Sequence, residues 1–169
     1  MYALSVVNAL GNIVLPDGYI LAGNRNGTGG FRTFDGLTRF VTQRSNTIIS
    51  TVGTNMKLGP RANIARVARM AAHGQIRATY PSGTSLDGDA VFAFSTEEID
   101  ETLNAEGRQF AQGDWFNFRT DLIGHMAARA VQNSIVEACA NVATQTVDFE
   151  AAFGGVIPSV HDYRLESSQ

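Results

Sequence analysis

An asparagine–threonine pair at the border between a polar loop and an apolar stretch offers the clearest chemistry in this chain. Arg44 to Asn46 is polar, and from Thr47 the residues become β-branched and apolar, as in a buried strand. If the Asn46–Thr47 bond were cut, the Thr47 hydroxyl could act as a nucleophile with its own new α-amine as the base. Because Asn is common in turns and Thr in strands, the pair alone favours an ordinary loop-to-strand junction.

A second candidate set is Asp87-Gly88-Asp89, which precedes another apolar stretch. Asp-Gly is a common turn pair, so a simple turn is one interpretation. The two carboxylates could also suggest a divalent cation, but the sequence places no further carboxylate or histidine cluster with them. We therefore predict neither a metal nor another cofactor.

The strands that must position these residues follow from the hydrophobic pattern. Residues 3–8 predict a buried strand that ends at Asn8, and residues 19–22 predict a short strand paired back on it. Thr47 to Thr54 and residues 90–95 predict two further strands. Because the first strand begins almost at residue 1 with nothing to cover it, we expect the missing cover to come from upstream sequence or from another chain.

Two helices complete the predicted elements. Pro60 opens the first, where its missing N–H costs nothing, and one apolar stripe follows. Thr120 or Asp121 can cap the second, which runs to about Val142 after a connector over residues 109–117. The Gly-rich residues 23–30 predict a surface loop. This order of elements predicts an α+β domain with helices packed over a sheet.

Composition limits the possible functions. The chain has 169 residues, 44% of them hydrophobic and 17% charged, which is typical of one globular domain. Its net charge of -3 gives no electrostatic footprint for nucleic acid. The single Cys139 excludes an internal disulfide, and no apolar run is long enough to cross a membrane. The first residues lack a basic leader and a cleavage site, so a cytoplasmic location is the default prediction.

From Asn46 to Thr96, and also at the start and more loosely near the end, the chain resembles the L-aminopeptidase/D-esterase family, which includes the β-aminopeptidases and the nylon-oligomer (6-aminohexanoate oligomer) hydrolases. The matching segments, in order, are SVVNALGNIVLPDGYILAG, NT opening a strand, MAAHGQIRA, DGD before AVFAFST, and GGVIPSVHDYR. The resemblance implies a layered αββα sandwich of the N-terminal-nucleophile-hydrolase type, of which this chain is the C-terminal half. It also implies self-cleavage into residues 1–46, the end of the α-piece, and residues 47–169, the nucleophile-bearing β-piece.

The resemblance also implies roles for individual residues. Thr47 would be the nucleophile. Asn8 would donate a hydrogen bond to the oxyanion or orient the substrate; the alternative interpretation is that Asn8 is a turn residue whose side-chain amide bonds to the backbone. Asp87 and Asp89 would lie near Thr47, one orienting its hydroxyl and the other holding its ammonium group. A Thr nucleophile together with DGD favours the nylon-oligomer-hydrolase branch. The family's upstream catalytic lysine has no counterpart here, because the only lysine is Lys57.

Three functional hypotheses follow. The first is a self-processing hydrolase of linear amides such as short peptides, amino-acid amides or 6-aminohexanoate oligomers, forming a homo-oligomer with a companion chain or upstream half. The second is a truncated, non-catalytic binding or assembly module. The third is an acyltransferase of the ornithine-acetyltransferase type, which also self-cleaves before Thr, although the DGD sequence argues against it. None of the three involves nucleic acid or a membrane.

Overall fold

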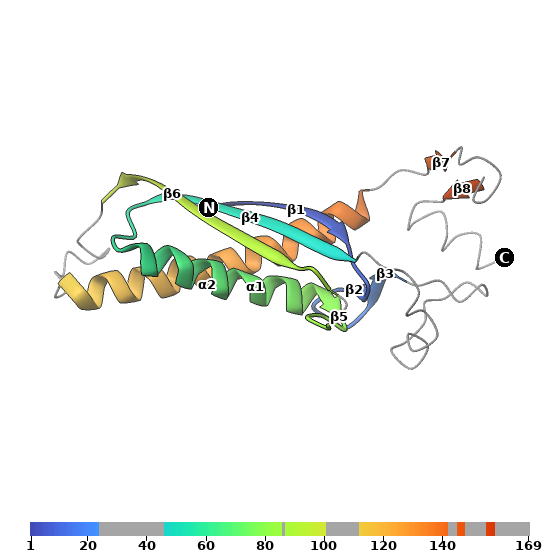
Figure 1. The fold of residues 1–169 in the computed structure, drawn as a ribbon, viewed down its shortest axis with the longest axis horizontal. Helices are drawn as coiled ribbons and strands as arrows, with labels where there is room; N and C mark the ends of the chain where they lie inside the picture. Colours follow the sequence, from blue (N-terminus) through green and yellow to red (C-terminus); the bar gives the residue numbers. More distant parts are fainter. Residues whose placement is uncertain (24–45, 86, 101–111, 142–144, 148–154, 158–169) are drawn as a thin grey trace.

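A computed structural model describes residues 1–23, 46–85, 87–100, 112–141, 145–147 and 155–157, with side chains of α2 described from residue 117 (Figure 1). The strands are β1 (Tyr2–Asn8), β2 (Asn12–Val14), β3 (Ile20–Ala22), β4 (Thr47–Met56), β5 (Thr79–Tyr80), β6 (Ala90–Ile99), β7 (Gln145–Val147) and β8 (Gly155–Ile157), and the helices are α1 (Arg61–Ala78) and α2 (Gln112–Ala140). Of the loop predicted over residues 23–30, residues 24–30 lie outside the described residues. The chain is α+β, as the sequence predicts.

The main sheet has the strand order β1-β4-β6, so the strand that begins at Thr47 is the central one. β1 pairs with β4 antiparallel, and β6 pairs with β4 in parallel. Helix α1 supplies the crossover between the two parallel strands, as such a connection requires. The three predicted main strands are confirmed, although β6 continues to Ile99, four residues beyond its predicted end.

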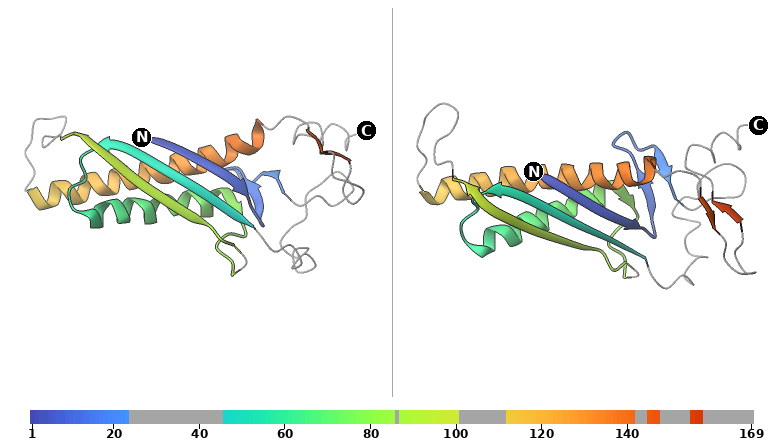
Figure 2. Two further views of the ribbon diagram at one scale, coloured as in Figure 1. Left: turned by 45° about the horizontal axis from the view of Figure 1, so that its top comes forward. Right: turned by 90° about the horizontal axis from the view of Figure 1, so that it is seen from above.

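Both helices pack on the same face of this sheet (Figures 1 and 2). The alternation of β4 turns Ile48 and Val52 toward the helices, and both are almost fully buried. They meet the predicted apolar stripe of α1 and a matching stripe of α2. The remaining core residues are Ile13, Leu58, Val67, Ala71, Ala78, Ile123, Ala127, Val131 and Ile135.

The opposite face of the sheet is also apolar, and no described element covers it. Its large side chains are 46–66% exposed: Tyr2, Leu4, Val6, Ile49, Phe92 and Phe94. The register places them in adjacent rows, because Val6 faces Ile49 and Thr51 faces Phe92. The main sheet and the two helices therefore form two layers, with a continuous apolar surface on the outer side of this sheet.

The prediction that residues 19–22 pair with the first strand is wrong. β3 pairs instead with β2, which also pairs with β5 at the end of α1, giving a second sheet of order β3-β2-β5. The turn of Leu15 to Tyr19, closed by the Gly18 N–H on the Leu15 carbonyl at 2.9 Å, joins β2 to β3. β2 and β3 therefore form a local hairpin. The turn around Gly11 lies between β1 of the main sheet and β2 of the second sheet.

The predicted start of the second helix is also wrong. α2 begins at Gln112, within the predicted connector, and ends at Ala140. Thr120 and Asp121 lie inside the helix and do not cap it. Thr120 is fully buried, and Asp121 pairs with Arg66 of α1 at 2.7 Å, so tertiary contacts override the capping preference of these residues.

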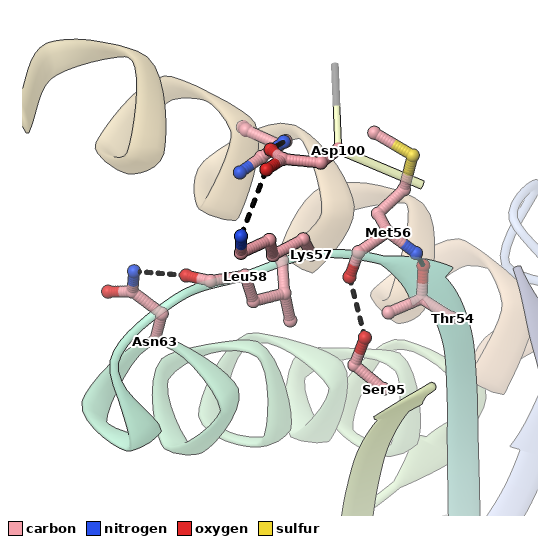
Figure 3. A network of polar contacts seen from close by, with 8 residues as sticks. Thr54, Met56, Lys57, Leu58, Asn63, Ser95 and Asp100 are labelled. Carbon is pink, nitrogen blue, oxygen red and sulfur yellow. Dashed lines mark hydrogen bonds and ion pairs between the residues drawn. The ribbon is translucent and has the colours of Figure 1, made fainter. Parts of the chain in front are cut away.

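Polar contacts fix the turn from β4 into α1 (Figure 3). Ser95 Oγ donates to the Met56 carbonyl at 2.6 Å, and Lys57 Nζ pairs with Asp100 at 2.9 Å. Asn63 Nδ2 donates to the Leu58 carbonyl at 2.7 Å and so ties the first turn of α1 to the loop. These contacts lie at the end of β4 opposite to Thr47.

The two helices approach each other closely at Gly74. A Cβ atom there would collide with the backbone carbonyl oxygen of Ala128 and lie 2.8 Å from Val131 Cβ. Gly124 of α2 is a matched case with a different neighbour, because a Cβ atom there would meet the flexible side chain of Met70.

We expect Gly74→Ala to destabilise the chain by about 1–3 kcal/mol, since the backbone at Ala128 cannot move aside. The gain of about 1 kcal/mol in helix propensity does not offset this collision. Gly124→Ala is the control, and we expect it to destabilise the chain less than Gly74→Ala, because the sulfur and methyl group of Met70 can rotate away and only its Cβ atom, at 3.0 Å, stays close. Urea unfolding of both variants measures the difference, and equal midpoints would show that the helices do not approach as described.

Candidate active site

Three strand ends meet where the sequence places its candidate residues. Asn8, the last residue of β1, faces Thr47, the first residue of β4, in the antiparallel register. The parallel register pairs Ile49 with Ala90, and an isolated bridge joins Asn46 to Asp87. The structure thus brings all four predicted residues to one end of the main sheet, nearest the labels β2 and β3 in Figure 1.

The Asn46–Thr47 peptide bond is the centre of this site. Thr47 Oγ1 donates a hydrogen bond to the carbonyl oxygen of Asn46 at 2.7 Å. The backbone N–H of Gly88 donates to the same oxygen at 2.9 Å. A hydroxyl group therefore lies beside the carbonyl that precedes it, and two donors converge on that carbonyl oxygen.

Gly88 approaches Thr47 so closely that a side chain would not fit without movement. A Cβ atom at Gly88 would lie 2.8 Å from Thr47 Oγ1 and 3.7 Å from the Asn46 oxygen. Gly88 is exposed, Thr47 is half-buried and Asn46 is buried. Gly88 was not among the predicted site residues, because Asp-Gly is a common turn pair.

Asp89 holds the backbone directly after the threonine. Its Oδ1 accepts the N–H of Ile48 at 2.7 Å. Burial raises the pKa of the Asp89 carboxyl above its ordinary value of 3.8, the Ile48 N–H opposes this shift, and the nearby charge of Asp87 adds to it. The carboxylate is therefore more basic than an exposed aspartate.

Asp87 makes its hydrogen bonds within its own loop. Its Oδ2 accepts the Thr84 N–H at 2.8 Å and the Thr84 hydroxyl at 2.9 Å. The Asp87 N–H donates in return to the Thr84 carbonyl at 3.1 Å. In the uncut chain the Thr47 hydroxyl donates to Asn46 and to neither aspartate, so the orientation of that hydroxyl differs from the arrangement that the resemblance implies.

Gln75 is a buried polar residue that the sequence analysis did not single out. Its Nε2 lies 3.1 Å from the Ile48 carbonyl oxygen, 3.2 Å from the Ala90 carbonyl oxygen and 3.2 Å from Ser50 Oγ. It thereby joins α1 to the beginnings of β4 and β6. Its position could have been suspected, because it follows Val67 and Ala71 at helical spacing on the buried face.

A chain of hydroxyl groups continues from Gln75 through the sheet. Ser50 Oγ lies 2.9 Å from Ser5 Oγ, which lies 2.6 Å from Ser134 Oγ of α2. Ser134 donates to the Val131 carbonyl at 2.9 Å. Since each hydroxyl has one proton, the direction is fixed: Ser50 donates to Ser5, and Ser5 donates to Ser134. The network links both helices to the strands that carry the site.

Other candidate features lie away from Thr47. Lys57 is at the opposite end of β4, where cavities of about 460 and 340 Å³ are lined by residues such as Thr54 and Asn55. The described residues contain no group of three or more His, Cys, Asp or Glu side chains suited to a metal ion. None of the helices in the described part of the chain has the length and hydropathy of a membrane span.

Comparison with known proteins identifies the family. The sequence model of Peptidase family S58 matches residues 6–151, a range that includes Asn8, Thr47, Asp87 and Asp89. The chain belongs to Peptidase family S58.

The chain is similar in sequence to two enzymes named 6-aminohexanoate-oligomer endohydrolase. That of Kocuria sp. (strain KY2) is 35% identical over 107 residues, and that of Paenarthrobacter ureafaciens is 34% identical over 107 residues. Each match covers 58% of this chain and 30% of the relative. The chain therefore matches less than a third of the length of these enzymes.

A solved structure also aligns with this member of Peptidase family S58. It is the L-aminopeptidase D-Ala-esterase/amidase from Ochrobactrum anthropi, described as a prototype for the serine aminopeptidases. The TM-score is 0.48 at 22% identity, and the alignment covers 72% of this chain and 32% of that chain.

The raised pKa of Asp89 makes stability depend on pH. A carboxyl whose pKa is higher in the folded state lowers stability as pH rises through that pKa. Asp89→Asn removes the charge and keeps an oxygen for the Ile48 N–H. With both chains kept uncut by Thr47→Ala, we expect Asp89→Asn to be more stable than its Asp89 parent at pH 7, with the difference vanishing below pH 3.8, the ordinary pKa. Urea unfolding between pH 3 and pH 7 measures this difference.

Asp89→Ala is the control for this experiment, since it removes both the charge and the acceptor. We expect it to be less stable than Asp89→Asn at every pH, because the Ile48 N–H loses its partner. A stability difference between the Asp89 parent and Asp89→Asn that stays constant with pH would contradict the assigned cause.

Proposed function

We propose that this chain carries the nucleophile of a self-processing amide hydrolase, with Thr47 as the attacking residue. The observation that carries the proposal is the placement of Thr47 Oγ1 at 2.7 Å from the carbonyl oxygen of Asn46. Membership in a peptidase family supports the same chemistry. This contact keeps the hydroxyl next to the carbonyl group whose carbon it must reach in an intramolecular acyl shift.

Self-cleavage would proceed in two steps. Thr47 Oγ attacks the Asn46 carbonyl carbon, the peptide C–N bond breaks, and the proton of the hydroxyl is transferred to the Thr47 nitrogen. Water then opens the resulting ester and leaves an Asn46 carboxylate. The products are residues 1–46 and residues 47–169, and the freed amine has a reference pKa near 8, so it can act as a base near neutral pH.

After cleavage, the neighbours of Thr47 acquire their catalytic roles. Asn8 faces Thr47 across the β1–β4 ladder, where its amide can donate to a substrate carbonyl. Asp89 holds the adjacent Ile48 N–H and can bind the new ammonium group of Thr47. Asp87 lies on the same turn and adds negative charge beside it. These roles remain predictions that mutation can test.

We propose linear amides as substrates, including short peptides, amino-acid amides and 6-aminohexanoate oligomers. The names of the two endohydrolase relatives support the last of these. The chain matches only 30% of the length of these relatives. We therefore also propose that it acts together with a companion chain or an upstream half, within a homo-oligomer. A cytoplasmic location and independence from cofactors remain predictions of the sequence.

A non-catalytic assembly module is the second candidate, and the uncovered apolar face of the β1-β4-β6 sheet favours it. Such a module would bind through that face without any need for the Thr47 hydroxyl. The acyltransferase hypothesis remains a prediction without a structural observation in its favour.

Thr47→Ala tests the proposed function directly. We expect the wild type to yield two pieces, residues 1–46 and 47–169, and Thr47→Ala to remain one chain because it has no nucleophile. Intact-mass spectrometry and N-terminal sequencing, which should find Thr47 as a new terminus, measure this outcome. Thr51→Ala, on the same strand, is the control and should be cut like the wild type. A wild-type chain that stays whole would favour the assembly module.

A further inference from the structure

The N–H group of Gly88 contacts the one oxygen on which self-cleavage would develop charge. It donates to the Asn46 carbonyl oxygen at 2.9 Å, beside the Thr47 hydroxyl at 2.7 Å. The two donors have different fates when the bond is cut. The hydroxyl must leave this oxygen to attack the carbon, whereas the backbone N–H can remain in place.

We propose that the Gly88 N–H is the oxyanion donor of the self-cleavage step, and that the turn from Thr84 to Asp87 aims it; this inference rests on the proposed function. In the step, Thr47 Oγ bonds to the Asn46 carbon, and the π electron pair of the carbonyl moves onto oxygen. The Gly88 N–H stabilises that negative charge. The C–N bond then breaks, the oxygen regains its double bond as an ester, and the hydroxyl proton ends on the Thr47 nitrogen.

The turn before Gly88 is held at three points. Asp87 Oδ2 accepts both the N–H and the hydroxyl of Thr84, at 2.8 and 2.9 Å, and the Asp87 N–H returns to the Thr84 carbonyl at 3.1 Å. The residue that follows is Gly88, whose N–H therefore has a fixed direction. A preorganised donor of this kind needs no rearrangement when the charge develops.

The absence of a side chain at position 88 fits the same role. A Cβ atom would lie 2.8 Å from Thr47 Oγ1, on the nucleophile itself. Gly88 thus brings a donor to the carbonyl oxygen while leaving the hydroxyl room to move. The Asn46–Asp87 bridge explains why a backbone N–H reaches this oxygen, since parallel strands place one there.

A simpler alternative is that the Gly88 hydrogen bond only strengthens the start of the β4–β6 pairing. The two alternatives differ in what they change. A structural bond affects the free energy of unfolding, whereas an oxyanion donor affects the cleavage rate far more than stability.

Replacing the Gly88 amide by an ester, with glycolic acid at position 88, removes the N–H without adding a side chain. We expect self-cleavage of the purified chain to slow by about 100- to 1,000-fold. The same replacement at Gly83, which has open space around it, is the matched control and should keep the wild-type rate. Gel densitometry over time measures the cleavage rate of both esters, and urea unfolding before cleavage measures the stability of each chain.

The outcomes separate this inference from the proposed function. If the wild type is never cut, the proposed function fails. If the wild type is cut and the Gly88 ester is cut at the same rate, only the role of Gly88 is overturned. A slower ester whose lost stability accounts for the whole effect would also overturn it.

Two further measurements keep the test decisive if the ester variant does not fold. Thr84→Val removes the hydroxyl that anchors Asp87 and should slow cleavage, while Thr84→Ser should restore the rate. In the uncut Thr47→Ala chain, NMR should detect a coupling through the hydrogen bond between the Gly88 nitrogen and the Asn46 carbonyl carbon. The absence of that coupling, or an equal rate for the two Thr84 variants, contradicts the proposal.

Discussion

The parallel pairing of β4 with β6 is the constraint on which the site depends, because it alone brings residues 46–47 beside residues 87–89. Gln75 of α1 stabilises this pairing, because its Nε2 donates to the carbonyl oxygens of Ile48 and Ala90 near the starts of the two strands. The serine chain then extends the contact through β1 to α2. A buried network whose members all have partners favours one arrangement of strands and helices over near alternatives. The Asn46–Thr47 peptide bond is thus held by the core as well as by the hydrogen bond from Gly88.

The main elements were predictable from the sequence because their patterns are long and regular. The strands at Thr47 and Ala90 are rich in β-branched, aromatic and other apolar residues, and α1 has an apolar stripe at helical spacing. The start of α2 was not predictable, since it depends on contacts distant in sequence. The pairing of β3 was missed for a different reason, because the three-residue strand β2 beside it was not recognised between the turn signals at Gly11 and Gly18. Thr120 and Asp121 have the composition of a helix cap, and only the packing against α1 shows why they lie inside a helix.

The candidate site divides in the same way. Thr47, Asn8, Asp87 and Asp89 were named from residue type and from the resemblance, and the structure places them together. Gly88 and Gln75 were missed because their contribution is a backbone N–H and a buried amide, which no side-chain motif reveals. The hydrogen bonds of the aspartates were also beyond the sequence. Asp87 serves its own turn and Asp89 the backbone of Ile48, a division that depends on the local path of the chain.

The central position of β4 has a consequence for the cut protein. A break before Thr47 would leave β4 paired with β1 on one side and β6 on the other, so the two fragments would stay associated without a covalent link. Once unfolded, however, they would be separate molecules whose reassembly requires an encounter in solution and depends on concentration. Maturation would then turn a chain that can refold by itself into a two-component assembly. Such an assembly persists because it unfolds slowly, so its stability is kinetic and does not depend on the ability to refold.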